Sequence, residues 1–201
     1  MMQKLAKAVS FLFHPLLMPT LGFLLLMNTG FYFALISFEA KRVILLIVVM
    51  STFLLPLISI GLMLFSPRFK LNLDKSSDRI FPMLSTAVFY YLGYYFLGKV
   101  PIYPIYRIVL VSSILTIAIL LLISTKWKIS AHLAGIGGLI GAFLALSFRL
   151  NIDSSVLLAA LILVAGVVGT ARILLGKHNP IQVYAGFFLG FAINYLIINY
   201  I

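Results

Sequence analysis

Long apolar runs follow one another along the chain, and short polar stretches separate them. Each run has about the length, roughly 20 residues, that a helix needs to cross the hydrocarbon of a bilayer. Only helices or closed barrels satisfy their backbone hydrogen bonds there, and barrel strands alternate apolar with polar residues. The run 43–55 does not alternate. We therefore predict an all-α fold, a polytopic transmembrane bundle of about six to seven spans.

The predicted spans cover residues 11–37, 43–65, 83–98, 107–125, 132–149, 154–175 and 180–200. The third is short and rich in tyrosine and phenylalanine, which leaves a tilted, an interfacial and a partly re-entrant arrangement open. No internal repeat and no second domain is visible. The chain is thus predicted to be a single membrane domain, residues 1–201, with two N-terminal spans in residues 1–65.

Composition supports a membrane protein and argues against a soluble domain or a nucleic-acid-binding protein. Of the 201 residues, 63% are hydrophobic and only 9% are charged, whereas a soluble domain usually carries about a quarter charged residues. The formal net charge of +11 could indicate nucleic-acid binding, but cytoplasmic loops and anionic lipid headgroups account for such an excess in membrane proteins. We therefore expect the bilayer as a partner and no nucleic acid.

Three polar connections should lie on one face of the membrane. The connections 66–82, 126–131 and 176–179 are each separated from the next by two predicted spans. This parity places them together, with the N-terminus, if the third and fourth segments either both cross or both fail to cross. The side itself is not decided by the positive-inside rule. Ten Lys and Arg residues lie on this face against five on the other, and seven against five remain without Lys75, Arg79 and Arg172.

The three connections collect the ionisable and hydrogen-bonding residues of a candidate site, namely Lys75, Arg79, Ser130, His132, Arg172, His178 and Gln182. Ionisable groups at the edge of a span are costly unless they are paired or functional. Ser130 is a candidate N-cap, and Asn179 before Pro180 is typical of a helix start. Two helix N-termini beside cations would favour phosphate. A metal ion is disfavoured, because only Asp74 and Asp78 would offset the positive charges.

Other polar and small residues have simpler interpretations. Lys126, Trp127 and Lys128 are typical of an anchor at headgroup level. His14, which precedes Pro15, lies near the same face but belongs to no motif. A group of glycines inside an apolar run is expected to permit close helix packing, as small residues do in bilayers; these are Gly135, Gly137, Gly138 and Gly141.

The order and spacing of these residues resemble the type 2 phosphatidic acid phosphatase superfamily. The third motif reads Arg172-x5-His178-x3-Gln182 and is followed by Gly186-x3-Gly190. The second keeps Ser130 and His132 but lacks the neighbouring Pro and Gly of the family. In the first, Lys75 and Arg79 are more closely spaced than usual, and Pro82 does not follow directly. The resemblance covers roughly residues 66–201, which are expected to form the family core.

The resemblance implies an in-line phosphoryl transfer that needs no metal and no cofactor. His178 would attack phosphorus to form a phosphohistidine, and His132 would protonate the leaving oxygen. The oxygens of the transition state would be held by Lys75, Arg79, Ser130 and Arg172. Gln182 stands where the family usually has Asp, and an amide oxygen can orient the histidine ring but cannot balance its charge. Branches that resemble glucose-6-phosphatase also carry Gln there.

A site at headgroup level suits an amphiphile, so the predicted partner is a membrane lipid that carries a monophosphate or diphosphate. The expected location is the inner (plasma) membrane of a bacterium, as a multi-pass protein. Two alternatives stay open: a catalytically degenerate relative that binds a phosphorylated lipid or acts as a scaffold, and a small transporter. The sequence predicts neither the substrate among lipid phosphates nor the oligomeric state.

Overall fold

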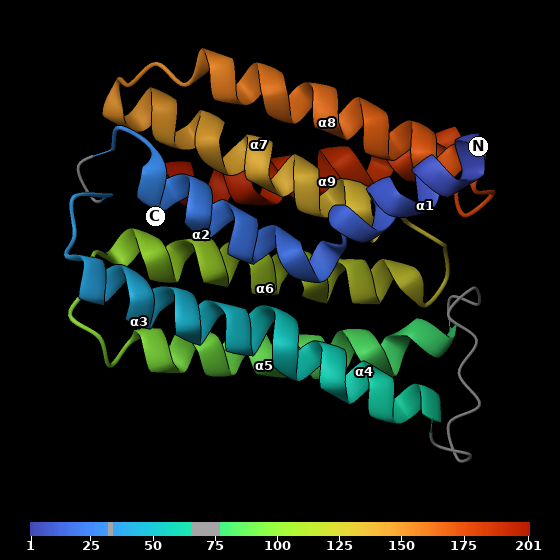
Figure 1. Cartoon of the computed structure of the whole chain (residues 1–201), viewed down its shortest axis with the longest axis horizontal. Coiled ribbons are helices and arrows are strands. Elements are labelled where there is room, and N and C mark those ends of the chain that lie inside the picture. The colour runs from blue at the N-terminus through green and yellow to red at the C-terminus, as the bar shows by residue number, and fades with distance from the viewer. Residues whose placement is uncertain (32–33, 66–76) are drawn as a thin grey trace. The chain divides into compact units, whose positions relative to one another are not determined.

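The computed structural model describes residues 1–31, 34–65 and 77–201, and within them the chain is helical with no strand. The helices of the fold are drawn in Figure 1 and comprise α1 (Met2–Leu12), η1 (Pro15–Leu17), α2 (Met18–Asn28), α3 (Phe38–Val49), η3 (Met50–Leu54), α4 (Leu55–Phe65), η4 (Ser77–Arg79), α5 (Ile80–Leu97), α6 (Pro104–Ser124), α7 (Ala131–Leu150), α8 (Ser155–Leu174) and α9 (Pro180–Tyr200).

Seven helical segments in the described part of the chain are long and apolar enough to cross a membrane. Two of them are composite: Met2–Asn28 combines α1, η1 and α2, and Phe38–Phe65 combines α3, the π-helical turn η3 and α4. The third segment, α5, is one uninterrupted helix of 18 residues. The predicted all-α transmembrane bundle is confirmed.

The first helical segment, Met2–Asn28, begins and ends about nine residues before the predicted span 11–37. The helix begins at Met2, because Lys4 and Lys7 lie on the exposed side of α1 and do not stop it. It is interrupted at His14, where Pro15 supplies no backbone N–H and a short 3-10 turn follows. It ends at Asn28. Hydropathy alone located the apolar residues but not the helix that contains them.

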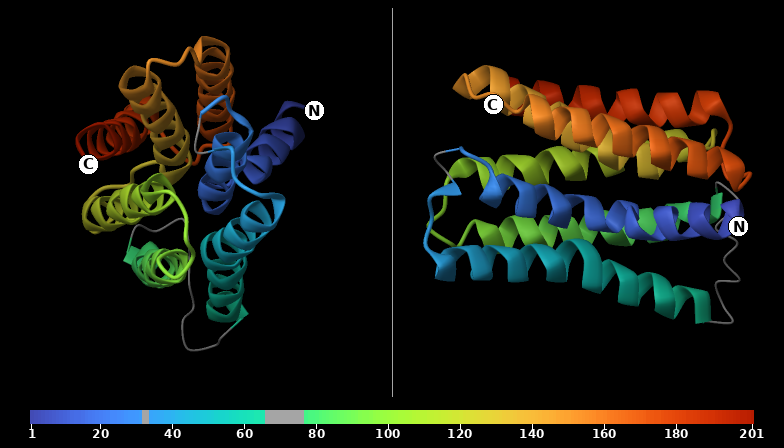
Figure 2. Two further views of the ribbon diagram at one scale, coloured as in Figure 1. Left: turned by 90° about the vertical axis from the view of Figure 1, so that its left-hand side faces the viewer. Right: turned by 45° about the horizontal axis from the view of Figure 1, so that its top comes forward.

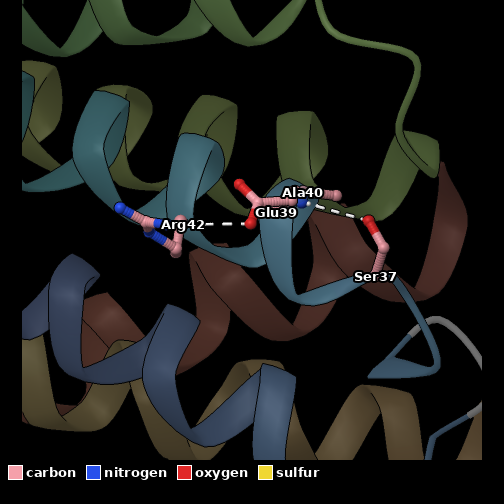
Figure 3. Close-up of polar contacts among 4 residues, drawn as sticks. All are labelled: Ser37, Glu39, Ala40 and Arg42. Atoms are coloured by element: carbon pink, nitrogen blue, oxygen red, sulfur yellow. Dashed lines mark hydrogen bonds and ion pairs between the residues drawn. The ribbon is translucent and has the colours of Figure 1, made fainter.

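Residues 39–42, predicted as a connection, form the first turn of α3. The Ser37 hydroxyl accepts a hydrogen bond from the Ala40 N–H at 3.2 Å and caps the helix. Arg42 and Glu39, three residues apart, form an ion pair at 3.7 Å (Figure 3). Glu39 also lies near the positive end of the helix dipole, so these charged residues favour the helix start.

The chain divides into two compact units. The first comprises Met1–Met18 and Lys128–Ile201, and the second comprises Pro19–Trp127. In the first unit α7 is the helix with the largest buried share. It packs most extensively against α9 and then against α8, while α1 packs against α8. Because α7, α8 and α9 alternate in direction, the start of α7, the end of α8 and the start of α9 lie at the same end as the start of α1 (Figures 1 and 2).

Glycines allow the backbones of α7 and α9 to touch. A Cβ atom on Gly190 would overlap the Ala134 carbonyl, and one on Gly137 would overlap the Phe187 carbonyl. Gly138 lies against the Asn194 side chain and Gly135 against Met18. The predicted role of the glycines of this apolar run in close packing is therefore confirmed, and it brings the first turns of α7 and α9 together.

The second unit is held mainly by apolar contacts. α5 packs against α6 and against α4. In its core, the rings of Phe23 and Tyr106 lie 5.8 Å apart, and both side chains are fully buried. The hydroxyls of Thr20 and Thr52 share a hydrogen bond at 3.3 Å, which connects α2 with the π-helical turn η3.

The connection between α7 and α8 lies at the other end of the first unit. Asn151 has a left-handed φ of 52° and ends α7. The Asp153 carboxylate accepts hydrogen bonds from the hydroxyl and from the N–H of Ser155, and these bonds lower the pKa of that carboxyl below its usual value. These residues organise a turn at the end of the unit that is remote from the candidate site.

Candidate functional site

The third motif spans the sharp turn between α8 and α9. Arg172 lies in the last turn of α8. The N–H groups of Gly176 and Lys177 donate to the carbonyls of Ile173 and Arg172, at 2.9 and 3.1 Å, which is the pattern of a Schellman motif. Gly176 has a φ of 62°, a left-handed conformation that glycine adopts without strain. The turn thus places His178 directly before the first turn of α9.

A capping box begins α9. The Asn179 side chain accepts from the Gln182 N–H at 2.9 Å, and the Gln182 side-chain oxygen accepts from the Asn179 N–H at 3.3 Å. Pro180 occupies the first turn, where a missing N–H costs nothing. The helix start predicted at Asn179–Pro180 is therefore confirmed, with Gln182 as the second member of the cap.

The same glutamine oxygen fixes the proton on His178. The backbone N–H of Asn179 can only donate, so the atom of Gln182 that faces it must be the oxygen Oε1. His178 Nδ1 lies 3.1 Å from that oxygen. Because an amide oxygen can only accept, Nδ1 must carry the proton, and the lone pair of the neutral ring is on Nε2. The His178 side chain is 7% exposed, so its orientation is also held by packing.

The second motif is hydrogen-bonded to the third. Ser130 is the N-cap residue of α7, as predicted, and its backbone N–H donates to the Gln182 carbonyl at 3.2 Å. Gly186 of α9 lies so close to Ser130 that a Cβ atom there would overlap the Ser130 carbonyl. The motifs that contain Ser130 and Gln182, which are distant in sequence, therefore meet in space.

The Ser130 hydroxyl does not cap its own helix. The side chain is fully buried, and its oxygen has no hydrogen-bond partner among the described residues. A buried hydroxyl without a partner usually costs about 1–3 kcal/mol. Such a donor at a helix N-terminus could stabilise a bound oxyanion, because it has no competing acceptor to release.

His132 lies in the first turn of α7, and its outer nitrogen faces α1. His132 Nε2 is 3.2 Å from the backbone carbonyl of Ser10. A carbonyl only accepts hydrogen bonds, so Nε2 must carry a proton and Nδ1 is the nitrogen that can exchange one. Sequence reasoning missed Ser10, because a contact between residues more than a hundred positions apart leaves no local pattern.

A second histidine accompanies His132. The rings of His14 and His132 meet edge to face, with centroids 5.6 Å apart and planes at 76°. His14 Nδ1 accepts a hydrogen bond from the Leu16 N–H at 3.3 Å. Electrostatic interactions connect Arg172 with both rings, and His178 with His132. All three histidines of the chain and Arg172 therefore gather at one end of the first unit.

The first motif is described only in part. Lys75 and its neighbour Asp74 lie outside the described residues. Arg79 ends the 3-10 turn η4 in the other unit, Pro19–Trp127. The participation of Lys75 and Arg79 in the site therefore stays a prediction, whereas Ser130, His132, Arg172, His178 and Gln182 are brought together.

The charge of the cluster favours an anion. Arg172 brings a positive charge from the last turn of α8, and the N-termini of α7 and α9 lie at the same end of the first unit (Figure 1). Within the described ranges no three His, Asp or Glu side chains are grouped as metal ligands. The arrangement of donors suits a phosphate group, as such helix N-termini commonly do.

Comparison with known proteins supports this interpretation for the C-terminal part of the chain. Residues 125–201 match the model of the PAP2 superfamily, and this segment contains the second and third motifs. The predicted resemblance is therefore confirmed there, while the extension of the core back to residue 66 stays a prediction. No curated protein and no solved structure gave a significant match.

Proposed function

We propose, from the PAP2-superfamily match of residues 125–201 and the geometry at His178, that this protein is a membrane phosphatase. It would hydrolyse a lipid phosphate or lipid diphosphate without a metal, through a phosphohistidine. The observation that carries the proposal is the Gln182 oxygen shared by the Asn179 N–H and His178 Nδ1, since it leaves the lone pair on Nε2. A nucleophilic histidine needs such a partner on its other nitrogen.

The reaction would take place in two displacements. In the first, His178 Nε2 forms a bond to phosphorus, the bond from phosphorus to the leaving oxygen breaks, and His132 gives that oxygen a proton. In the second, water attacks the phosphohistidine and His132 takes a proton from the water. Inorganic phosphate is then released, and His178 returns to its neutral form with the proton on Nδ1.

Charge stabilisation would come from the donors around the reacting phosphate. Phosphoryl transfer depends chiefly on positioning and on neutralising the equatorial oxygens. Ser130, buried and at the start of α7, and Arg172, at the end of α8, are the donors that support this role. Lys75 and Arg79 would add two cations from the first motif.

The substrate class follows from where the site lies. The cluster is at the ends of apolar helices, so the phosphate of an amphiphile could reach the cations while its tail stays in hydrocarbon. Phosphatidate, phosphatidylglycerol phosphate, a polyprenyl diphosphate and a phosphorylated glycolipid all satisfy this chemistry. We therefore propose that the substrate is a lipid phosphate and that the protein lies in the inner membrane of a bacterium.

The test is phosphate release by purified protein from a panel of these lipids. We expect wild type to release phosphate from at least one, His178→Ala to lose turnover by at least about 10³-fold, and Ile181→Ala to keep it. Ile181 is a matched control, because it lies three residues after His178, in the first turn of α9, and is 70% exposed. Equal turnover in wild type and His178→Ala would refute the nucleophile. Binding of vanadate without any release would favour the lipid-binding alternative.

A further inference from the structure

The contact of His132 with the N-terminal helix goes beyond the three motifs. The chain has three histidines, and two of them, His14 and His132, form the edge-to-face pair. Both lie within helical segments apolar enough to cross a membrane. Ionisable residues in such segments are rare and usually functional. The match to the PAP2 superfamily begins only at residue 125, so it assigns nothing to α1.

Two backbone groups fix the protons on this pair. The Ser10 carbonyl faces His132 Nε2, which must therefore donate. The Leu16 N–H faces His14 Nδ1, which must therefore accept, so the proton of neutral His14 is on Nε2. Neither assignment depends on a titratable partner, because a backbone carbonyl and a backbone N–H each have one possible role.

The ring of His14 limits how His132 can turn. A rotation of the His132 ring about its Cβ–Cγ bond would move Nε2 away from the Ser10 carbonyl and break the hydrogen bond between them. His14 packs against that ring at 76°, and His14 is itself held by its bond to the Leu16 N–H and by the following Pro15. This edge-to-face contact therefore favours the ring plane in which Nε2 faces the Ser10 carbonyl.

We propose that α1 completes the acid–base half of the site: the Ser10 carbonyl and the His14 ring hold His132 with Nε2–H bonded to Ser10, so that Nδ1 exchanges the proton. His14 is then a positioning residue. This inference rests on the proposed phosphatase function. In the first displacement His132, protonated on both nitrogens, gives its Nδ1 proton to the leaving oxygen and stays bonded to Ser10 through Nε2. In the second, Nδ1 takes a proton from the attacking water.

The proton positions can be measured without any activity. With only three histidines, ¹⁵N-labelled imidazoles can be assigned by single substitutions in protein reconstituted in nanodiscs. At a pH where the rings are neutral, we expect Nε2–H on His14 and His132 and Nδ1–H on His178. We expect His14→Asn, which preserves a cap for the Leu16 N–H, to give a mixture of tautomers at His132. A wild-type His132 with its proton on Nδ1, or an unchanged His132 in His14→Asn, would overturn the inference.

The kinetic test uses the leaving group as the readout. A general acid matters for an alkoxide leaving group and little for a nitrophenolate, and it contributes about 10²–10⁴-fold where it matters. The first displacement must be followed by itself, in a single turnover, because the second displacement is common to both substrates. We expect His14→Asn to slow release of the leaving alcohol from an alkyl lipid phosphate at least tenfold, while changing the burst rate of nitrophenolate release from 4-nitrophenyl phosphate less than threefold. His14→Phe, which keeps the ring contact, should restore the alkyl rate to within about threefold of wild type.

The outcomes separate the inference from the function on which it rests. Equal losses on both substrates would mean that His14 is only structural. A normal alkyl rate in His14→Asn, with a loss in His14→Phe, would mean that only the cap on the Leu16 N–H matters. Either result overturns the positioning role. A wild type without turnover on any substrate refutes the proposed function instead, and the imidazole spectra then decide the proton positions by themselves.

Discussion

Gln182 performs two tasks with one oxygen atom. It completes the capping box of α9 through the Asn179 N–H and orients His178 through Nδ1. An amide can replace a carboxylate here because the backbone N–H fixes which of its two polar atoms faces the ring. In a serine-protease triad the corresponding amide substitution costs about 10⁴-fold through the wrong tautomer; under the proposed mechanism the bond from the Asn179 N–H would hold the Gln182 oxygen toward His178 and avoid that tautomer.

A prediction follows for Gln182. Gln182→Glu keeps both hydrogen bonds and adds a charge that stabilises the phosphorylated ring, so turnover should equal or exceed that of wild type. Gln182→Leu has a similar volume but no acceptor, and turnover should fall by about 10²–10⁴-fold. Both rates are measured on the lipid that wild type hydrolyses best. Equal turnover in Gln182→Leu and wild type would contradict the orienting role.

Ser130 should show opposite effects on stability and activity. Ser130→Ala removes a buried hydroxyl that has no partner in the described part of the chain, so thermal stability should stay equal or rise by up to about 1 kcal/mol. Turnover should fall by about 10²–10³-fold, as for other lost oxyanion donors. Thermal unfolding in detergent and phosphate release measure the two effects. A stability loss with unchanged turnover would mean that the hydroxyl is structural.

At the scale of elements, the lengths of the apolar runs predict which parts of the chain span the membrane, but not the residues at which each helix begins and ends. The apolar run begins at Phe11, but the helix begins at Met2, because Lys4 and Lys7 lie on the exposed side of α1 and do not stop it. The start of α9 was predictable, since Asn179 and Pro180 are local signals. The contact of α1 with His132 was not, because it depends on how distant helices pack.

The glycine contact between α7 and α9 supports the site and can be tested by adding a methyl group. Gly190→Ala would place a Cβ atom against the Ala134 carbonyl, separate the helices and cost about 1–3 kcal/mol, with loss of turnover. Gly166→Ala is a matched control, because it is also mid-helix but has no neighbouring atom within 4 Å of the added Cβ. Thermal unfolding compares them. Equal stability of the two variants would mean that the close packing is unnecessary.

At the scale of the whole molecule, the number of spans decides which residues share a membrane side. The sequence predicted this parity, and seven helical segments long enough to cross are present in the described residues. Within the first unit, the ends that hold the second and third motifs coincide because three helices alternate in direction. The place of the first motif was not derivable from spacing, since Lys75 and Arg79 depart from the family pattern.

The absence of cysteine makes this topology directly testable. Single cysteines at Lys4, Lys128 and Lys177 should react with an impermeant maleimide from one side of oriented vesicles. Cysteines at Ile152 and Ile201 should react only from the other side, because an odd number of crossings separates them from the first group. Labelling of Lys128→Cys and Lys177→Cys from opposite sides would separate the second motif from the third and contradict the site.

The most direct test of the central claim is to trap the covalent intermediate. Purified protein is mixed with a ³²P-labelled lipid phosphate that the wild type hydrolyses. The reaction is quenched within the turnover time, under alkaline conditions that preserve phosphohistidine, and the peptides are analysed by mass spectrometry. We predict phosphate on Nε2 of His178 in wild type, more of it in His132→Ala with an aryl phosphate, and none in His178→Ala. Turnover without phosphate on His178, or label on another residue, would contradict the proposed mechanism.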